Sequence, residues 1–187
     1  MRFEKGHKEM TRKRIIDVAS RRFRKDGVAA SGLAGIMADS GLTNGAFYAH
    51  FDSKEDLVRE SLSSALSGQL GQLEQAHEDA IDIEGAIRRY LNMSHLEGRE
   101  EGCPSAALLP EISRQPTQTR KVYEDQLLAY TKNLATLLPN SKSAQATAIF
   151  SLMVGTLQMA RAVSDPLLAE EILEGGVQAA LSLATAR

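Results

Sequence analysis

The sequence predicts an all-α protein, and three observations support this. Apolar residues recur at helical spacing, strand-like alternation is absent, and glycine and proline interrupt the chain only at wide intervals. The 187 residues, 43% of them hydrophobic, are enough to bury a core. A single Cys, no apolar run near the ~20 residues of a membrane span, and no signal-peptide core at the N-terminus predict a cytoplasmic protein without membrane contact.

The first predicted helix runs from Thr11 to Lys25, with an apolar stripe that includes Ile15 and Phe23. Residues 1–25 hold ten Lys and Arg against three Asp and Glu, whereas the whole chain carries a net charge of -2. A basic end on an acidic body indicates a polyanionic partner for that end. A solvated basic helix is the alternative interpretation.

The next residues have the pattern of a helix-turn-helix. Ser31 is expected to cap a second helix, which Gly41 ends at a turn, and Thr43 to cap a short third helix. Phe47 and Phe51 of the third helix are expected to point into a small core. A helix-turn-helix places such a third helix in the major groove of DNA, so these residues predict a duplex-binding domain.

Candidate DNA contacts lie in the first turn of the third helix or at helix starts. Asn44 can pair with adenine, and small residues beside it allow close approach to the groove. Tyr48 and His50 carry donors for phosphate oxygens, and Lys54 at a helix N-terminus is a candidate phosphate clamp. The full predicted set is Ser31, Thr43, Asn44, Gly45, Tyr48, His50 and Lys54. Arg12, Lys13 and Arg14 are expected to add affinity that depends on salt.

Residues 11–58 resemble the DNA-binding domain of the TetR/AcrR family of transcriptional regulators. The motifs that carry the resemblance are Ala19, Phe23, Gly27, Ser31, Ile36, Gly41-Leu42-Thr43, Gly45, Phe47-Tyr48, His50-Phe51, Lys54-Glu55 and Leu57. Gly32, Met37 and Ser40 depart from the usual residues, and Gly32 weakens the second helix. By resemblance, Thr43, Tyr48, His50 and Lys54 match DNA-contacting positions.

The resemblance implies a DNA-binding domain over residues 1–53 and a helical ligand-binding and dimerisation domain over residues 54–187. Ser53 and Asp56 form a capping-box variant that starts a long helix to about His77. A further helix is predicted over Asp82–Leu96, followed by a charged loop over 98–102.

Prolines set the limits of the next helices. Pro104 fits a first helical position with Cys103 at the cap, Pro110 shortens or kinks that helix, and Pro116 opens another. The residues Pro139-Asn140-Ser141 are expected to end it.

Two Ala- and Leu-rich helices, over Ala144–Val163 and Leu167–Ala184, end the chain. Their apolar character predicts a homodimer that pairs these helices; the alternative is that they only complete the core.

The residues expected to line an inducer pocket are large, apolar or amphipathic side chains of the central helices. They are Tyr90, Met93, His95, Cys103, Leu108, Tyr123, Leu127, Tyr130 and Met153, each of which is otherwise a plain core residue. Cys103, at a helix N-terminus, is also a candidate reactive thiol, and some similar TetR-type repressors sense electrophiles or oxidants in this way. A buried small hydrophobe is the alternative for this residue.

The predicted function is a ligand-responsive regulator, most simply a repressor that a small molecule releases from a palindromic double-stranded operator. No cofactor, metal or catalytic residue is expected. Glu74 and His77 match a single carboxylate–histidine unit of a di-iron bundle, which requires two such units. Two alternatives remain open: an architectural DNA-binding protein without a ligand switch, and a helical enzyme that carries a vestigial helix-turn-helix.

Overall fold

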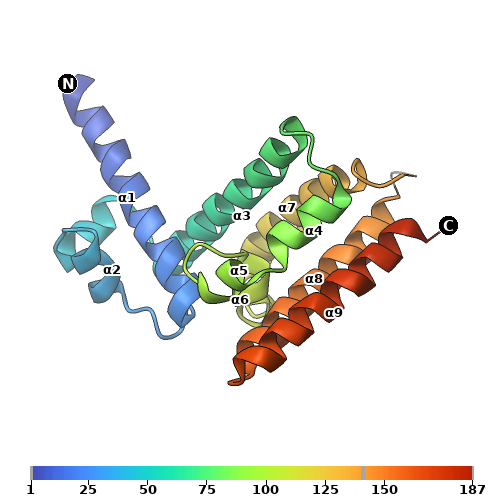
Figure 1. Ribbon diagram of the computed structural model, residues 1–187. Helices are drawn as coiled ribbons and strands as arrows, with labels where there is room; N and C mark the ends of the chain where they lie inside the picture. Colours follow the sequence, from blue (N-terminus) through green and yellow to red (C-terminus); the bar gives the residue numbers. More distant parts are fainter. Residues whose placement is uncertain (1, 140–141, 187) are drawn as a thin grey trace.

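The computed structural model describes residues 2–139 and 142–186, and for residues 2–5 the backbone alone. Within these ranges the regular structure is entirely helical (Figure 1). The elements are α1 (Arg2–Asp26), α2 (Leu33–Asp39), the 3₁₀ helix η1 (Asn44–Ala49), α3 (Lys54–Glu78), α4 (Ile83–Tyr90), α5 (Met93–Glu97), α6 (Pro104–Ile112), α7 (Thr117–Ala135), α8 (Ser143–Ala162) and α9 (Pro166–Thr185). The all-α prediction is therefore confirmed. The predicted break at Asn140–Ser141 lies outside the described residues.

The first hydrophobic core joins α1, α2, η1 and the beginning of α3. Phe23, Ile36, Phe47 and Leu57 are each no more than 2% exposed there. The rings of Phe47 and Phe51 stack with centroids 5.5 Å apart, which fixes η1 against this core. Figure 1 shows α2 on one side of α1 and α3 on the other. The inward orientation predicted for the two phenylalanines is confirmed.

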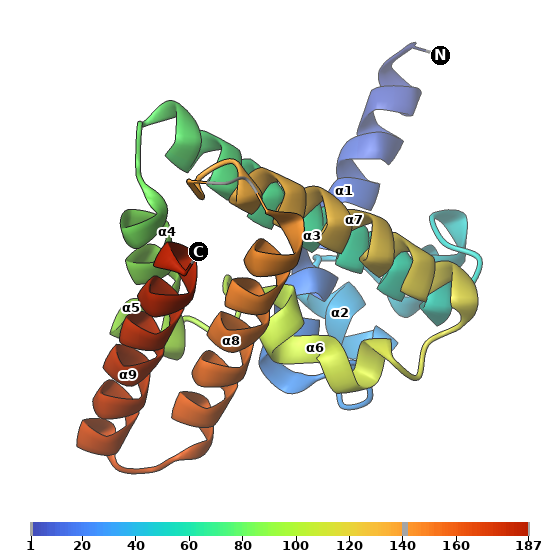
Figure 2. The ribbon, with the colours of Figure 1, turned by 90° about the vertical axis from the view of Figure 1, so that its right-hand side faces the viewer.

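A second, larger core joins α4 and α7 to the last two helices. Ile87, Leu134, Ile149 and Leu157 are completely buried in it. In Figure 2, α8 and α9 run side by side as an antiparallel pair, and α7 lies along α3. Among the described residues, no helix is long and apolar enough to cross a membrane.

The helix α3 belongs to both cores. Leu57 and Leu62 of its first half are buried in the first core, whereas Leu73 is buried in the second. Leu108 and Ile112 of α6 also pack into the first core. The division expected after residue 53 falls at the start of α3, whose first half packs into the first core.

Several predicted helix limits were wrong. The helix α1 begins at Arg2 rather than at Thr11. The cap of α2 is Gly32 and not Ser31, because the Ser31 hydroxyl donates to the Gly27 carbonyl at 2.7 Å. The single helix expected over Asp82–Leu96 is broken, since the Asn92 side chain accepts from the His95 N–H at 2.8 Å and starts α5 anew.

Other predicted limits are confirmed. Ser53 caps α3 by accepting from the Asp56 N–H at 3.1 Å. Pro104 occupies the first turn of α6 after Cys103, and Pro116 precedes α7. Gly41 has φ +69°, a left-handed conformation that glycine adopts without strain, and it ends the α2 segment at the turn.

The helices α8 and α9 pack closely against each other at Gly176. A Cβ atom at this position would lie 2.4 Å from the Thr156 methyl carbon, well inside van der Waals contact. We therefore expect Gly176→Ala to force the helices apart and to lower the free energy of unfolding by ~1–3 kcal/mol. Urea denaturation at a fixed protein concentration measures this change.

Gly71 on α3 supplies the matched control, because a Cβ atom there meets no atom within 4 Å. Gly71→Ala should stabilise the protein by about 0.5–1 kcal/mol through helix propensity alone. An equal response of the two variants would contradict the close-packing argument.

Candidate DNA interface and ligand cavity

The helix η1 presents a polar face to solvent above its buried phenylalanines. Thr43, Asn44 and Gly45 at its start are exposed, and the Tyr48 side chain is 72% exposed. The Tyr48 ring meets the buried Phe47 ring edge to face, with centroids 5.2 Å apart. Thr43 occupies the cap position but makes no side-chain capping bond, so its hydroxyl is available to a partner. Four of the seven predicted DNA contacts thus lie together on one accessible surface.

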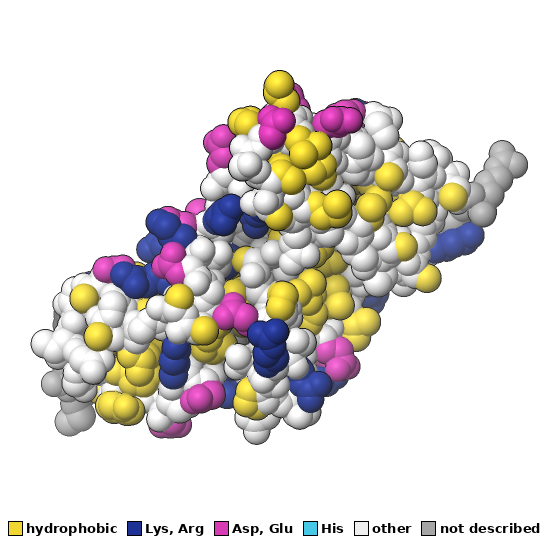
Figure 3. Space-filling view, turned by 90° about the horizontal axis from the view of Figure 1, so that it is seen from below, with side chains coloured by type: hydrophobic (Ala, Val, Ile, Leu, Met, Phe, Trp, Pro, Cys, Tyr) yellow, Lys and Arg dark blue, Asp and Glu magenta, His cyan; other side chains and the backbone are white. Residues whose placement is uncertain are grey.

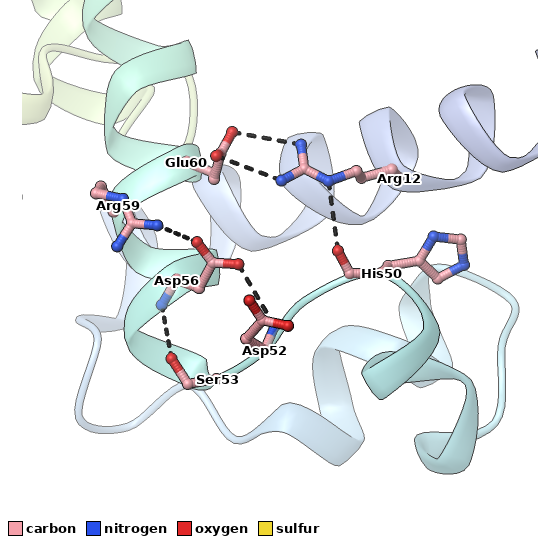
Figure 4. Close-up of polar contacts among 7 residues, drawn as sticks. All are labelled: Arg12, His50, Asp52, Ser53, Asp56, Arg59 and Glu60. Carbon is pink, nitrogen blue, oxygen red and sulfur yellow. Dashed lines mark hydrogen bonds and ion pairs between the residues drawn. The ribbon is translucent and has the colours of Figure 1, made fainter.

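Arg12 of α1 fixes η1 relative to α3 (Figure 4). Its guanidinium lies 3.3 Å from the Glu60 carboxylate, donates to the His50 carbonyl at 3.4 Å, and stands 4.7 Å from the centre of the Phe51 ring. Arg12 therefore acts mainly inside the domain, in contrast to the phosphate-binding role that the basic run predicted for it.

His50 and Lys54 lie beside this junction. In Figure 4 the His50 imidazole points away from α3. Partial burial, with Lys8 and Arg12 nearby, lowers the pKa of His50. The Lys54 ammonium donates to the Val28 carbonyl at 2.9 Å, so it ties the start of α3 to the α1–α2 turn.

Ser31 is 1% exposed and its hydroxyl is already used within the domain. The structure thus separates Ser31 from the exposed candidates, and its contact with DNA stays a prediction.

A cavity of about 880 Å³ opens between α1 and α3 and extends inward to α4, α5, α6 and α7. Its inner part is formed by buried side chains that include Leu73, Tyr90, Cys103 and Tyr130. Its outer part runs along α1 past Lys13, Arg14, Arg21 and Arg24. The volume falls within the range of small-molecule sites in proteins.

His95 organises the backbone at the inner part of the cavity. Its Nδ1–H donates to the Tyr90 carbonyl at 2.7 Å, and its Nε2 accepts from the Cys103 N–H at 2.9 Å. This arrangement requires the neutral ring with the proton on Nδ1. Burial lowers the pKa of His95, the bond to the Tyr90 carbonyl opposes this, and the nearby Arg161 guanidinium lowers the pKa further.

Four of the nine predicted pocket residues line this cavity: Tyr90, His95, Cys103 and Tyr130. The other five do not line it: Met93, Leu108, Tyr123, Leu127 and Met153. For these five the alternative of plain packing holds, since they contact one or other hydrophobic core.

The sequence interpretation missed the polar walls of the cavity. Gln69, Gln72 and Gln75 of α3 line it at three-residue spacing, opposite the basic side chains of α1. Three long amides on one helix face were a signal available in the sequence. The contribution of α1 had no such signal, because only the fold places it beside the central helices.

Polar contacts link α6 and the loop before it to α1 and to the turn that follows α1. Glu111 of α6 accepts from the backbone N–H groups of Val28 and Ala29 at 2.9 and 3.2 Å. The loop that precedes Cys103 is held on α1, because the Arg24 side chain donates to the Glu100 carbonyl at 2.6 Å.

The comparisons with known proteins agree with this arrangement. Residues 15–61 match the family model of bacterial regulatory proteins of the tetR family. Residues 15–61 therefore form a DNA-binding domain of the tetR family. It is 40% identical over 93 residues to the HTH-type transcriptional regulator TtgR of Pseudomonas putida, covering 49% of this chain and 44% of that protein. It is 41% identical over 68 residues to AcrR of Shigella flexneri, covering 35% and 32% of the two chains. The chain thus matches less than half the length of these curated relatives.

Solved structures of TetR-family fold cover nearly the whole chain. A TetR-family transcriptional regulator from Cytophaga hutchinsonii superposes with a TM-score of 0.78 at 18% identity, over 97% of this chain and 98% of that one. FadR of Bacillus subtilis, solved in complex with stearoyl-CoA, superposes with a TM-score of 0.64 at 18% identity, over 88% and 97%. At this identity the likeness establishes the fold of both TetR domains.

The TetR-family resemblance predicted from residues 11–58 is therefore confirmed.

In residues 2–139 and 142–186 there is no group of three or more His, Cys, Asp or Glu side chains placed to hold a metal ion.

The neutral state of His95 predicts a pH-dependent stability. The unfolded chain takes up a proton on this residue near pH 6.5, whereas the folded protein resists protonation until a lower pH. The free energy of unfolding therefore keeps its full value above about pH 6.5, and it falls as the pH drops through the lowered pKa that His95 has in the folded protein. His95→Gln should remove this part of the loss, which amounts to at most ~1.4 kcal/mol per pH unit.

Urea denaturation of both proteins between pH 8 and pH 5 measures this difference. His50 has a lowered pKa as well but is present in both proteins, so the comparison isolates His95. Parallel stability curves for the two proteins would contradict the assignment.

Proposed function

We propose that this TetR-family protein is a DNA-binding transcriptional regulator that a small molecule releases from its operator. The observation that carries the proposal is the exposed face of η1, on which Thr43, Asn44 and Tyr48 stand above a completely buried Phe47. A short helix with buried aromatic anchors and exposed small and polar side chains has the form of a recognition helix. The named relatives are transcriptional regulators, which supports the same role here.

The proposed assembly is a homodimer through α8 and α9. Met159 on α8 is 64% exposed, and Leu167 and Leu168 at the start of α9 are 76% and 42% exposed. Figure 3 shows the molecule from the end at which these two helices connect, and hydrophobic side chains are exposed on this part of the surface. Gly155 and Gly175 have open space above them, so a second copy can approach closely. Two recognition helices in one dimer would match a near-palindromic operator.

The proposed ligand site is the cavity between α1 and α3. A ligand there touches α1, which packs on both α2 and α3. It also lies beside the loop that Arg24 holds against α1. Release from DNA then requires only that the ligand bind more tightly to a conformation with altered recognition-helix spacing. The stearoyl-CoA complex of FadR supports a ligand-binding role for this fold. The cavity is what favours a ligand-responsive regulator over an architectural DNA-binding protein.

Operator binding tests this proposal. Fluorescence anisotropy with duplexes that tile the DNA beside the gene should reveal tight, saturable binding to one tile. Asn44→Ala should reduce the preference for that tile over scrambled duplex, by about 1–3 kcal/mol if Asn44 pairs with one base. Lys54→Gln should weaken binding to all duplexes and lower the salt slope by about one.

Lys132, which is exposed on α7, supplies the control for Lys54. Lys132→Gln should leave affinity and salt slope unchanged. Uniform weak binding of the unaltered protein to every tile would contradict a specific regulator. An unchanged salt slope in Lys54→Gln would assign Lys54 to its bond with Val28 alone.

A second candidate function, an electrophile or redox sensor, is favoured by one observation. The Cys103 thiol lies on the cavity wall, 3.1 Å from the Gln69 side-chain nitrogen, while its residue is only 3% exposed. An electrophile small enough to enter the cavity would reach this sulfur without an exposed thiol on the surface.

On this alternative, N-ethylmaleimide should release the protein from its operator, and Cys103→Ser should abolish that release. The substitution should leave operator affinity unchanged, because Cys103 lies outside the recognition surface. Release that persists in Cys103→Ser would exclude the thiol switch, since Cys103 is the only cysteine of the chain.

A further inference from the structure

The cavity between α1 and α3 has an apolar end and a charged end. At the inner end Leu73, Ala76, Ala86 and Tyr130 are each at most 8% exposed. The outer end carries five basic side chains, four from α1 and one from α4, and three acidic ones. The basic residues are Lys13, Arg14, Arg21, Arg24 and Arg89; the acidic residues are Asp17, Asp79 and Glu101. An occupant that fills the cavity therefore meets an apolar surface at one end and an excess of positive charge at the other.

The inner end also holds a hydrogen-bond donor without a partner. The Tyr90 residue is 7% exposed, and its hydroxyl makes no hydrogen bond to any described residue. Burial, and then the neighbouring Cys103 thiol, raise the pKa of Tyr90, so the hydroxyl keeps its proton at neutral pH. A buried hydroxyl without an acceptor is unfavourable, and a ligand atom that accepts from it removes this penalty.

Glu101, which pairs with Arg21 and Arg24, is held only weakly. Glu101 lies 3.8 Å from Arg21 and 3.6 Å from Arg24, and its own side chain is 72% exposed. Ion pairs this long and this exposed contribute little to stability. The Arg24 side chain, by contrast, is only 9% exposed, so its charge is poorly hydrated. An incoming anion can therefore take the place of Glu101 at these two guanidinium groups.

We propose that this cavity binds an anionic amphiphile of small-molecule size. Its apolar body lies on Leu73 and Tyr130, it accepts a hydrogen bond from the Tyr90 hydroxyl, and its acidic group lies among the α1 arginines. Such a ligand displaces Glu101 from these two guanidinium groups. The inference rests on the proposed function only in treating this cavity as the effector site.

Two fluorescent probes that share an N-phenylnaphthylamine body test the charge preference. One is 8-anilinonaphthalene-1-sulfonate, which is anionic, and the other is N-phenyl-1-naphthylamine, which is neutral. The chain contains no Trp, so protein emission does not interfere. With the full chain and no DNA, we expect one site per protomer and about tenfold tighter binding of the sulfonate at low salt. Added salt should weaken the sulfonate and not the neutral probe.

Two substitutions locate the site. Arg14→Gln should weaken the binding of the sulfonate about fivefold and leave the binding of the neutral probe unchanged. Arg114 is an exposed arginine outside the cavity, so Arg114→Gln should change the binding of neither probe. Gly68 lines the cavity, and a Cβ atom there would meet no atom within 4 Å, so Gly68→Leu adds bulk to the cavity wall and should weaken the binding of both probes at least tenfold. Gly71→Leu on the same helix has equal room but lies outside the cavity, and should weaken neither.

Equal affinity for the two probes, or no effect of Arg14→Gln on the sulfonate, would overturn the anionic preference. Unchanged binding in Gly68→Leu would place the probes elsewhere and overturn the site. Preferential binding of a cationic amphiphile such as ethidium at this site would assign the cavity to the opposite charge and also overturn the proposal. These titrations contain no DNA. A failure of operator binding therefore overturns the proposed function and leaves this site standing. A failure of probe binding overturns this site and leaves operator binding untouched.

Discussion

The whole arrangement depends on one continuous helix being shared by two hydrophobic cores. The helix α3 spans 25 residues, about 37 Å, without interruption. Leu57 and Leu62 near its start are buried with η1, and Leu73 near its end is buried in the larger core. A rigid element anchored at both ends transmits a change of angle rather than absorbing it. The orientation of η1 is therefore coupled to packing at the other end of the same helix.

Polar contacts with the turn between α1 and α2 connect the two cores from a second direction. Glu111 holds the α1–α2 turn through two backbone N–H groups, and Lys54 holds the same turn through the Val28 carbonyl. Val28 is thus bonded on both sides of its backbone, once to α6 and once to α3. Gly27 beside it has φ +84°, and a Cβ atom there would lie 3.3 Å from the Glu111 carboxylate. A shift of α6 would therefore also move the turn that precedes α2.

The sequence predicted the helical class, the helix-turn-helix and the capping of α3, because each depends on neighbours in the chain. Ser53 and Asp56 are three residues apart, and Phe47 and Phe51 are four apart, so local spacing determines their contacts. The sequence interpretation failed at Ser31, whose hydroxyl finds the Gly27 carbonyl instead of the next helix. It also failed at Asn92, where a side-chain cap broke a periodic apolar pattern. In both cases a local side-chain bond competed with helix continuation, and composition does not determine which prevails.

The cavity shows why large central side chains did not by themselves identify the site. Tyr90 and Tyr130 line it, whereas Met153 and Leu127, equally large and equally periodic, pack in the core. Burial does not distinguish these residues, because all four lie in or against the same hydrophobic core; only the fold determines which of them also line the cavity. The basic run of α1 was interpreted as a surface for a polyanion, yet the fold divides it among three roles. Arg12 fixes the recognition helix, Arg22 pairs with Asp39 of α2 at 2.6 Å, and Arg14 faces the cavity. A run of basic residues on a helix that packs on two sides therefore predicts several different contacts. Only the direction of each side chain in the fold determines which contact each residue makes.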